Sequence, residues 1–512
     1  MGIGEEGYGR LLAMGSLELA NGYLSGALEG QVYDGPWTDI KEDVEKINSL
    51  LKIGGGNDVH SWSATAMYYD NDWNSADQIP DRAVSSGLVD EFGSIDSTLG
   101  GNTRRASLSG QYSHQHESHR SEWRGYVIDS ELDLWSNFTY LLDDPVEGDQ
   151  FRQRDDRTIF GGSYSRFWVS GLNNHFHHRM GAEVRYDDID TVGLYRTRDR
   201  RRIGIVREDA VEQGSSGLFY ELDWRFATDW RAVLGIRGDY YRFDVDAGEP
   251  VNGGDDSDSI VSPKASLIYA FSDTSEAYLS GGYGFHSNDA RGVTARIDPV
   301  SGEAVSSADP LVESKGAEFG FKGVWLDSWN ASLALWYLER DSELLFVGDA
   351  GTTEASRPSE RWGVELNNFL TLNEIWSLEV DLAWTDAKFS DSAPEGDDIP
   401  SALEYVATGA ISARYPSGWF GSFRIRFFGD APLVEDGSVE SDGSTIANLA
   451  LGWSNNDWRL QVDVLNMFDS DDHDIDYFYA SRLQGEPQEG VQDMHYHIFE
   501  PRQVRVYLTR NF

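Results

Sequence analysis

Apolar and polar residues alternate with a period of two along most of this 512-residue chain. In the segment 458–466, three aliphatic residues share one face and three polar residues share the other: Leu460, Val462 and Val464 against Arg459, Gln461 and Asp463. Successive side chains of a β-strand point to opposite faces, so this pattern predicts strands with one apolar and one polar face. A long series of such segments, with charged residues on the second face, favours a barrel with a wet interior over a soluble sandwich.

The connections between these segments alternate between short and long. Short turns are predicted at Asn21-Gly22, Ala227–Asp229, Ser272–Thr274, Asp327-Ser328, Leu372–Glu374, Pro416–Gly418 and Asn455–Asp457. Long polar connections are predicted at Asp244–Ile260, Asn288–Pro310, Asp386–Ser401, Asp430–Ser444 and Asp469–Phe499. Outer-membrane barrels have short periplasmic turns and longer extracellular loops, and the sequence predicts the same asymmetry here.

The pattern gives ten hairpins, near residues 8–33, 46–71, 103–142, 157–187, 216–245, 262–287, 312–341, 360–388, 403–430 and 445–468. A closing strand near 500–512 brings the total to 21 strands. Bacterial single-chain barrels have an even number of strands. We therefore predict an all-β transmembrane antiparallel barrel of about 21–22 strands, in which a first strand ahead of Tyr8 is missing.

Composition excludes several classes of function. The formal net charge of −45 argues against nucleic-acid binding, because a phosphate backbone requires a basic surface. The chain has no cysteine, so disulfides and thiolate metal sites are excluded. It contains no run of apolar residues long enough for a membrane helix. No catalytic sequence motif is found either, so we expect neither an enzyme nor a cofactor, although an acidic soluble β protein or hydrolase remains an alternative.

Several segments together resemble the barrel of TonB-dependent outer-membrane receptors. The chain reads Leu465-Asn466-Met467-Phe468-Asp469, then a long loop, then Pro501-Arg502 and a terminal aromatic strand that ends at Phe512. Met467 replaces the leucine usual in that family. The stretches Ser262–Leu267, Tyr283–Asp289 and Glu313–Lys322 resemble the middle of the same barrels.

The resemblance implies a single barrel domain over residues 1–512, located in the outer membrane of a Gram-negative bacterium. It implies TonB-dependent uptake of a scarce solute of the siderophore, metal-chelate, vitamin or oligosaccharide class. The expected partners are that solute, outer-membrane lipid and lipopolysaccharide, and the barrel-assembly machinery, which reads the terminal Phe512. The family's plug domain is not recognised, so we expect a plugless fragment, and the TonB complex would engage only a plug-containing form. A passive porin-like channel is the alternative function.

The last long loop holds the candidate ligand-binding residues. Imidazoles and carboxylates at short spacing could bind a metal or a metal chelate, and the alternative is that they are solvated polar residues. The candidates are Asp471, His473, Asp474, Asp493, His495 and His497. Two other histidine clusters, 114–119 and 175–178, map to short turns on the periplasmic side, where capture of a solute is not expected. Three acids, Asp255, Asp256 and Asp258, could form a calcium-binding loop, with a flexible acidic loop as the default. Several tryptophans near strand ends are expected in interfacial girdles: Trp37, Trp62, Trp168, Trp329, Trp376, Trp419 and Trp458.

Overall fold

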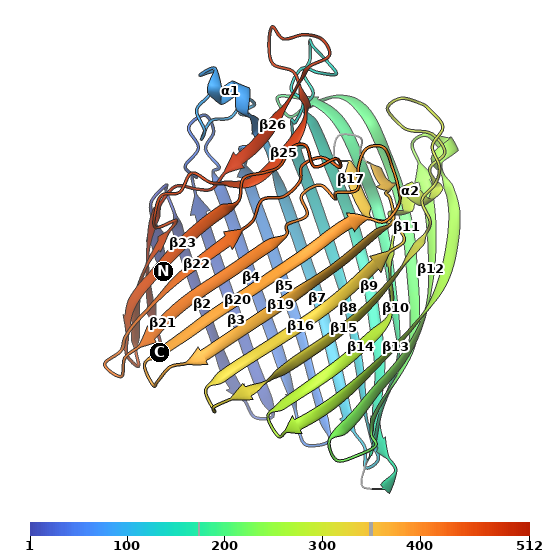
Figure 1. The fold of residues 1–512 in the computed structure, drawn as a ribbon, viewed down its shortest axis with the longest axis vertical. Helices are drawn as coiled ribbons and strands as arrows, with labels where there is room; N and C mark the ends of the chain where they lie inside the picture. The colour runs from blue at the N-terminus through green and yellow to red at the C-terminus, as the bar shows by residue number, and fades with distance from the viewer. Residues whose placement is uncertain (173–174, 348–351) are drawn as a thin grey trace.

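A computed structural model describes residues 1–172, 175–347 and 352–512 as a closed antiparallel barrel of 22 strands (Figure 1). The barrel strands are β1 (Gly2–Gly4), β2 (Gly9–Leu19), β3 (Gly22–Tyr33), β4 (Val44–Gly56), β5 (His60–Asn74), β7 (Gly100–Gln115), β8 (His119–Ser136), β9 (Phe151–Ser170), β10 (Phe176–Arg198), β11 (Arg201–Arg225), β12 (Trp230–Ala247), β13 (Gly254–Ser272), β14 (Ser275–Ser287), β15 (Leu311–Trp325), β16 (Trp329–Arg340), β19 (Ser359–Thr371), β20 (Trp376–Phe389), β21 (Tyr405–Arg414), β22 (Trp419–Phe428), β23 (Ser444–Ser454), β24 (Trp458–Leu465) and β27 (Gln503–Arg510).

Smaller elements lie in the connections at the long-loop end. They are β6 (Ile79–Pro80), α1 (Asp81–Ser85), η2 (Pro250–Asn252), α2 (Ala290–Thr294), β17 (Leu344–Val347), β18 (Thr352–Ala355), β25 (His473–Ser481) and β26 (Val491–Ile498). Within the described residues, neither α-helix has the length and apolar composition needed to cross a membrane.

The barrel closes where β1 inserts between β2 and β27. Gly2 pairs with Tyr507, and Gly4 pairs with Arg505. A Cβ atom at Gly2 would lie 2.8 Å from the Tyr507 ring, so glycine permits this close approach. The strand count of 21–22 is therefore confirmed at 22, and the strand expected to be missing before Tyr8 is present as three residues.

All ten predicted hairpins are formed, and each predicted short turn joins two neighbouring strands. The predicted loop Asp244–Ile260 is wrong over most of its length, because β12 runs to Ala247 and β13 begins at Gly254. Asp255, Asp256 and Asp258 therefore lie in β13, paired with β12, and form no calcium-binding loop. The polar residues here extend the barrel wall, since β9 to β13 are 18–25 residues long and a membrane crossing needs only about 9–11.

The two faces of the wall differ as predicted. Leu460 and Leu508, a cross-strand pair, are exposed on the outer face of the barrel. On the inner face, Gln461 accepts a hydrogen bond from Arg459 at 2.7 Å and donates one to Asp463 at 2.7 Å. An apolar outer face suits hydrocarbon, and a hydrogen-bonded inner face suits a water-filled lumen.

Exposed aromatic residues mark the short-turn end of the outer face. Trp329, Trp376, Trp419 and Trp458 each begin a strand directly after a short turn, and all four are exposed. Trp37 does not belong to this group: it is buried in a long connection, where its Nε1 donates a hydrogen bond to Glu42 at 2.7 Å. The girdle role expected for Trp37 is therefore wrong, because the surrounding loops enclose it.

We predict that Leu108→Arg destabilises the barrel by about 2–4 kcal/mol in a bilayer, because it places a charge on the lipid face. Leu108 is 55% exposed on the outer face of β7. The matched control is Ser109→Arg on the next residue, which points into the lumen and should be nearly neutral. Unfolding titrations in vesicles measure both, and equal destabilisation by the two variants would contradict the assignment of faces.

Candidate functional site

Four long connections pack together above one side of the barrel. They are residues 34–43, 75–99, 137–150 and 466–502, and we call them the outer-loop assembly. The last of them folds into the β25–β26 hairpin, and β26 pairs with β6 to make a three-stranded sheet above the barrel wall (Figure 1). The expected long loop Asp469–Phe499 is thus a structured hairpin.

Two apolar clusters hold the outer-loop assembly together. The first consists of Trp37, Ile40, Ala76 and Ile498, and the second of Ala83, Tyr140 and Leu483. Each cluster joins the last connection of the barrel to its early connections. Burial of these side chains removes apolar surface from water, which favours one fixed arrangement of the loops.

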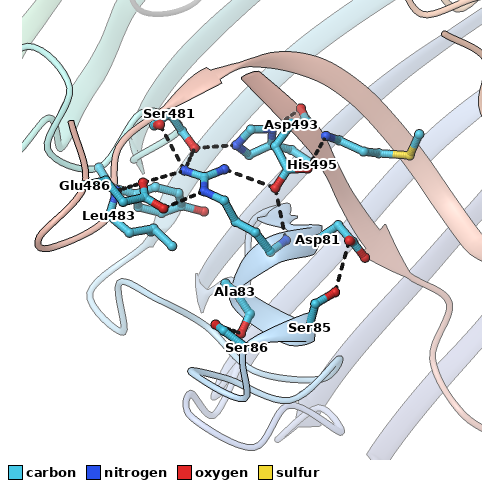
Figure 2. Close-up of polar contacts among 12 residues, drawn as sticks. Asp81, Ala83, Ser85, Ser86, Ser481, Leu483, Glu486, Asp493 and His495 are labelled. Carbon is cyan, nitrogen blue, oxygen red and sulfur yellow. Dashed lines mark hydrogen bonds and ion pairs between the residues drawn. The ribbon is translucent and has the colours of Figure 1, made fainter. Parts of the chain in front are cut away.

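Arg82 adds an ionic centre to the assembly. Its guanidinium donates hydrogen bonds to Glu486 Oε1 at 2.8 Å and to Asp493 Oδ2 at 3.1 Å. It also donates to the backbone oxygen and the hydroxyl of Ser481, each at 2.9 Å. Figure 2 shows Ser481, Glu486 and Asp493 facing α1 from the hairpin. The hydrogen bond from Arg82 lowers the pKa of Glu486, so this carboxylate stays ionised and paired.

The predicted ligand residues lie on this hairpin, but each imidazole has its own partner. His473 Nδ1 lies 2.7 Å from Asp476 Oδ1, and its ring stacks on Tyr496 with centroids 3.9 Å apart. His497 Nδ1 lies 2.8 Å from Asp474 Oδ1, and its ring contacts Trp37.

The third imidazole, His495, is fully buried. Its Nε2 lies 2.7 Å from the Ser481 hydroxyl, and its ring stacks on Tyr479 at 3.8 Å. Asp493 is held by Arg82, while Asp471 lies exposed just before β25. Across the described part of the chain, no three histidine or acidic groups stand in an arrangement that could hold a metal ion.

The surroundings shift the pKa values of two of these histidines in opposite directions. Burial, aided by the charge of Arg82, lowers the pKa of His495 to about 4. Burial also opposes protonation of His473, but its hydrogen bond to Asp476 and the nearby Asp442 and Asp472 raise its pKa overall. His495 is therefore neutral at neutral pH and acts as a packing group of the hairpin.

Another connection, residues 288–310, lies against the inner wall of the barrel mouth. Ala290 of α2 packs against Val211, Phe243 and Val245, which face inward. Arg291 pairs with Asp289 at 2.7 Å. Although burial opposes ionisation, Arg291 lowers the pKa of Asp289, so the pair remains charged and fixes α2 in place.

The lumen is open and polar toward the short-turn end. A cavity of about 1140 Å³ lies there, and charged residues of β12, β14, β15 and β20 line it: Arg231, Glu276, Lys322 and Asp381. Lys322 pairs with Glu276 at 3.1 Å across neighbouring strands. The molecule therefore combines a packed loop assembly at one end with a wet interior at the other.

Sequence reasoning missed Arg82, the residue that ties the assembly together. Its acidic partners, Glu486 and Asp493, are about 400 residues away in the chain. No local periodicity marks such a contact, because it exists only once the barrel closes. The only available signal is the scarcity of basic residues in an acidic chain, which makes each arginine a candidate partner for carboxylates.

Comparison with known proteins identifies the class. The family described as "TonB dependent receptor-like, beta-barrel" matches residues 48–467. The chain belongs to this family of TonB-dependent receptor barrels, whose members are outer-membrane proteins of Gram-negative bacteria.

Solved structures share the fold at low sequence identity. The ferric-catecholate import receptor Fiu from E. coli K12 is 14% identical, with a TM-score of 0.75 over 100% of this chain and 81% of that one. The ferric yersiniabactin uptake receptor FyuA from Yersinia pestis is 13% identical, with a TM-score of 0.80 over 100% and 79%. The copper transporter OprC is 15% identical, with a TM-score of 0.77 over 100% and 79%. Two of these proteins are named as receptors and the third as a transporter.

We predict that Arg82→Ala loosens the outer-loop assembly without opening the barrel. Removing one partner of a largely buried ion pair leaves Glu486 and Asp493 uncompensated, at a cost of about 3 kcal/mol. Hydrogen exchange should rise in residues 75–99 and 466–502 and stay unchanged in the barrel strands. Arg104→Ala, which breaks an exposed pair with Glu131, is the control and should cost less than about 1 kcal/mol. Equal effects of the two substitutions would contradict the role of Arg82.

The His495 environment also predicts an acid-sensitive hairpin. Between its ordinary pKa of 6.5 and its folded value of about 4, the opened hairpin binds a proton that the folded hairpin does not. The free energy of opening therefore falls as the pH is lowered through this window. Hydrogen exchange of residues 466–502, corrected for intrinsic rates, should be faster at pH 5 than at pH 7.5, and His495→Asn should reduce this difference.

Two other groups in the assembly provide internal checks. Burial raises the pKa of Asp77 to about 6, so acidification stabilises the fold around this carboxyl. This effect opposes that of His495. The contribution of His495 is therefore taken from the difference between the wild type and His495→Asn. The raised pKa of His473 means that its contribution is lost as pH rises. His473→Asn should therefore increase the acid sensitivity, and a decrease would refute this sign.

Proposed function

We propose that the chain is the barrel of a receptor in the outer membrane that takes up a scarce solute with energy from the TonB complex. The observation that carries the proposal is a closed 22-strand barrel with a packed, charged loop assembly at one end and short turns at the other. Family membership supports it, and the compared structures are named as receptors or transporters of iron chelates and copper. A passive porin-like channel would not need such an assembly over its mouth.

The outer-loop assembly is the proposed place of solute capture. Its exposed members, Asp471 and Asp474, and the half-buried His497 can contact a solute. His495 and Asp493 hold the hairpin in shape. His473 contacts Asp476 and is assigned to neither group. Metal chelates and other small solutes that present cationic or hydrogen-bonding groups fit a rim of carboxylates and imidazole.

The remaining partners follow from the same proposal. The apolar outer face would contact outer-membrane lipid and lipopolysaccharide. Phe512 is fully exposed beyond β27, where the barrel-assembly machinery could read it. The TonB complex would act on a form that carries a plug in the lumen.

The proposal is tested by uptake in cells that carry the gene in its native context. Radiolabelled ferric catecholate, ferric citrate, ferric yersiniabactin and copper are offered to strains with and without TonB. We expect uptake of at least one solute, and we expect it to disappear without TonB. Uptake that is equal in both strains would overturn energised transport in favour of a passive channel.

The capture site is tested by measuring binding of the solute that the uptake assay identifies to isolated outer membranes. We expect the combined change Asp471→Asn, Asp474→Asn and His497→Gln to weaken binding of the transported solute by about tenfold or more, which is about 1.4 kcal/mol. Asp436→Asn, an exposed acid in a different connection, is the matched control. If both variants bind alike, capture does not involve the β25–β26 hairpin.

A further inference from the structure

Histidines concentrate at one edge of the barrel. Seven of the eleven lie at the short turns of three neighbouring hairpins: His60 at the β4–β5 turn, His114, His116 and His119 at the β7–β8 turn, and His175, His177 and His178 at the β9–β10 turn. The strands concerned are consecutive in the barrel wall (Figure 1). The proposed solute capture at the opposite end of the barrel makes no use of these residues.

Strand register places most of these imidazoles on the outer, lipid-facing side. Trp62 of β5 pairs with Tyr112 of β7. His60 and His114, each two residues nearer its turn, form the next pair on the same face. Trp62 is 44% exposed on the outer face, and the period of two puts His60 on that same face. The same register places His119 outward on β8 and His178 outward on β10.

The outward imidazoles form a continuous row. Ring centroids lie 4.3 Å apart between His60 and His114, 3.7 Å between His114 and His116, and 4.1 Å between His116 and His119. Farther along, His178 stacks on Trp168 at 4.8 Å. Arg166 of β9 points outward between these two groups, where it pairs with Ser121 of β8 and with Met180 of β10. We call His60, His114, His116, His119, Arg166 and His178 the rim row.

An aromatic band borders the rim row on the side of the barrel wall. Tyr112 contacts Trp123 with centroids 5.5 Å apart, and Trp123 contacts Tyr164 at 5.3 Å. Two imidazoles of the row share hydrogen bonds with tyrosine hydroxyls: His60 Nδ1 lies 2.6 Å from the Tyr112 hydroxyl, and His178 Nδ1 lies 2.7 Å from the Tyr220 hydroxyl. Aromatic bands mark the depth of the membrane interface. His60, His114, His116 and His119 lie nearer the turns than this band, at the depth of the phosphate groups, whereas His178 lies among aromatic residues, beside Trp168 and Phe176.

We propose that the rim row binds phosphate groups of anionic phospholipids in the periplasmic leaflet, more tightly as its imidazoles become protonated. The inference rests on the proposed location of the barrel in a membrane. Four imidazoles in successive contact repel one another when charged, and a phosphate that accepts hydrogen bonds from two of them relieves that repulsion. Arg166 supplies a permanent charge beside His119. Asp58 and Glu117 are the acids in the adjoining turns.

A metal ion fits this row less well than phosphate does. Stacked rings about 4 Å apart direct their nitrogens side by side, whereas a metal ion needs ligand nitrogens that converge on one point about 2.0–2.1 Å away. Among the residues that the structure describes, no group of three metal ligands is present. Lipid phosphates, in contrast, can contact successive members of an extended row.

The test compares barrel stability in two kinds of vesicle. The full chain is inserted into vesicles of phosphatidylcholine alone, or of phosphatidylcholine with phosphatidylglycerol, at pH 5.5 and pH 7.5, and its unfolding temperature is measured. We expect phosphatidylglycerol to raise the unfolding temperature more at pH 5.5 than at pH 7.5. The variant His60→Gln, His114→Gln, His116→Gln and His119→Gln should lose most of this pH-dependent gain.

Two controls separate the outcomes. His473→Gln lies in the outer-loop assembly, so it should change the unfolding temperature equally in both lipids and leave the gain intact. The variant His114→Lys and His116→Lys should show at pH 7.5 the lipid preference that the wild type shows at pH 5.5.

Three results would overturn the inference: the glutamine variant keeps the full gain, the lysine variant shows no new lipid preference, or a chelator abolishes the gain in the wild type. The last would identify a metal bridge in place of direct phosphate binding. Failure of the wild-type chain to insert into either vesicle would instead refute the proposed membrane location, and the rim row inference with it.

Discussion

Pairing of every backbone N–H and C=O group along the wall is the constraint on which this structure depends. A sheet edge left open in hydrocarbon would expose unpaired polar groups at several kcal/mol each, so the barrel must close. Closure here rests on three residues of β1, held between β2 and β27. Inside the wall at this point, the Arg505 guanidinium lies over the Tyr8 and Tyr33 rings, 4.2 Å and 5.3 Å from their centroids.

Closure also creates the candidate site. It brings the last connection of the chain, residues 466–502, beside the connections that follow β3, β5 and β8. Only then can Arg82 reach Glu486 and Asp493, and only then can Ile498 pack on Trp37. The loop assembly is therefore a consequence of barrel topology, and its fixed shape comes from apolar burial together with one largely buried ionic centre.

The sequence predicted the hairpins well, because each depends on local alternation and on turn residues a few positions apart. It failed where a segment's environment mattered more than its composition. The acidic stretch at Asp255 reads as a loop, yet it extends a strand, since pairing with β12 satisfies its backbone. Trp37 reads as an interfacial residue, yet loops distant in sequence bury it. The imidazoles of the last loop read as one cluster, yet they point to three different partners.

The sequence by itself determined the class of fold, the number of hairpins, the alternation of apolar and polar faces and the family, because these follow from short-range periodicity. Only the tertiary structure decided which polar groups meet. His495 is buried against Ser481, whereas His114 and His116 stand in an outward row. Nothing in their immediate sequence separates these histidines. The difference arises because side-chain environment is set by what packs against each hairpin. β6, from far earlier in the chain, pairs with β26 at His495, whereas His114 and His116 lie on the outer side of the wall at the β7–β8 turn.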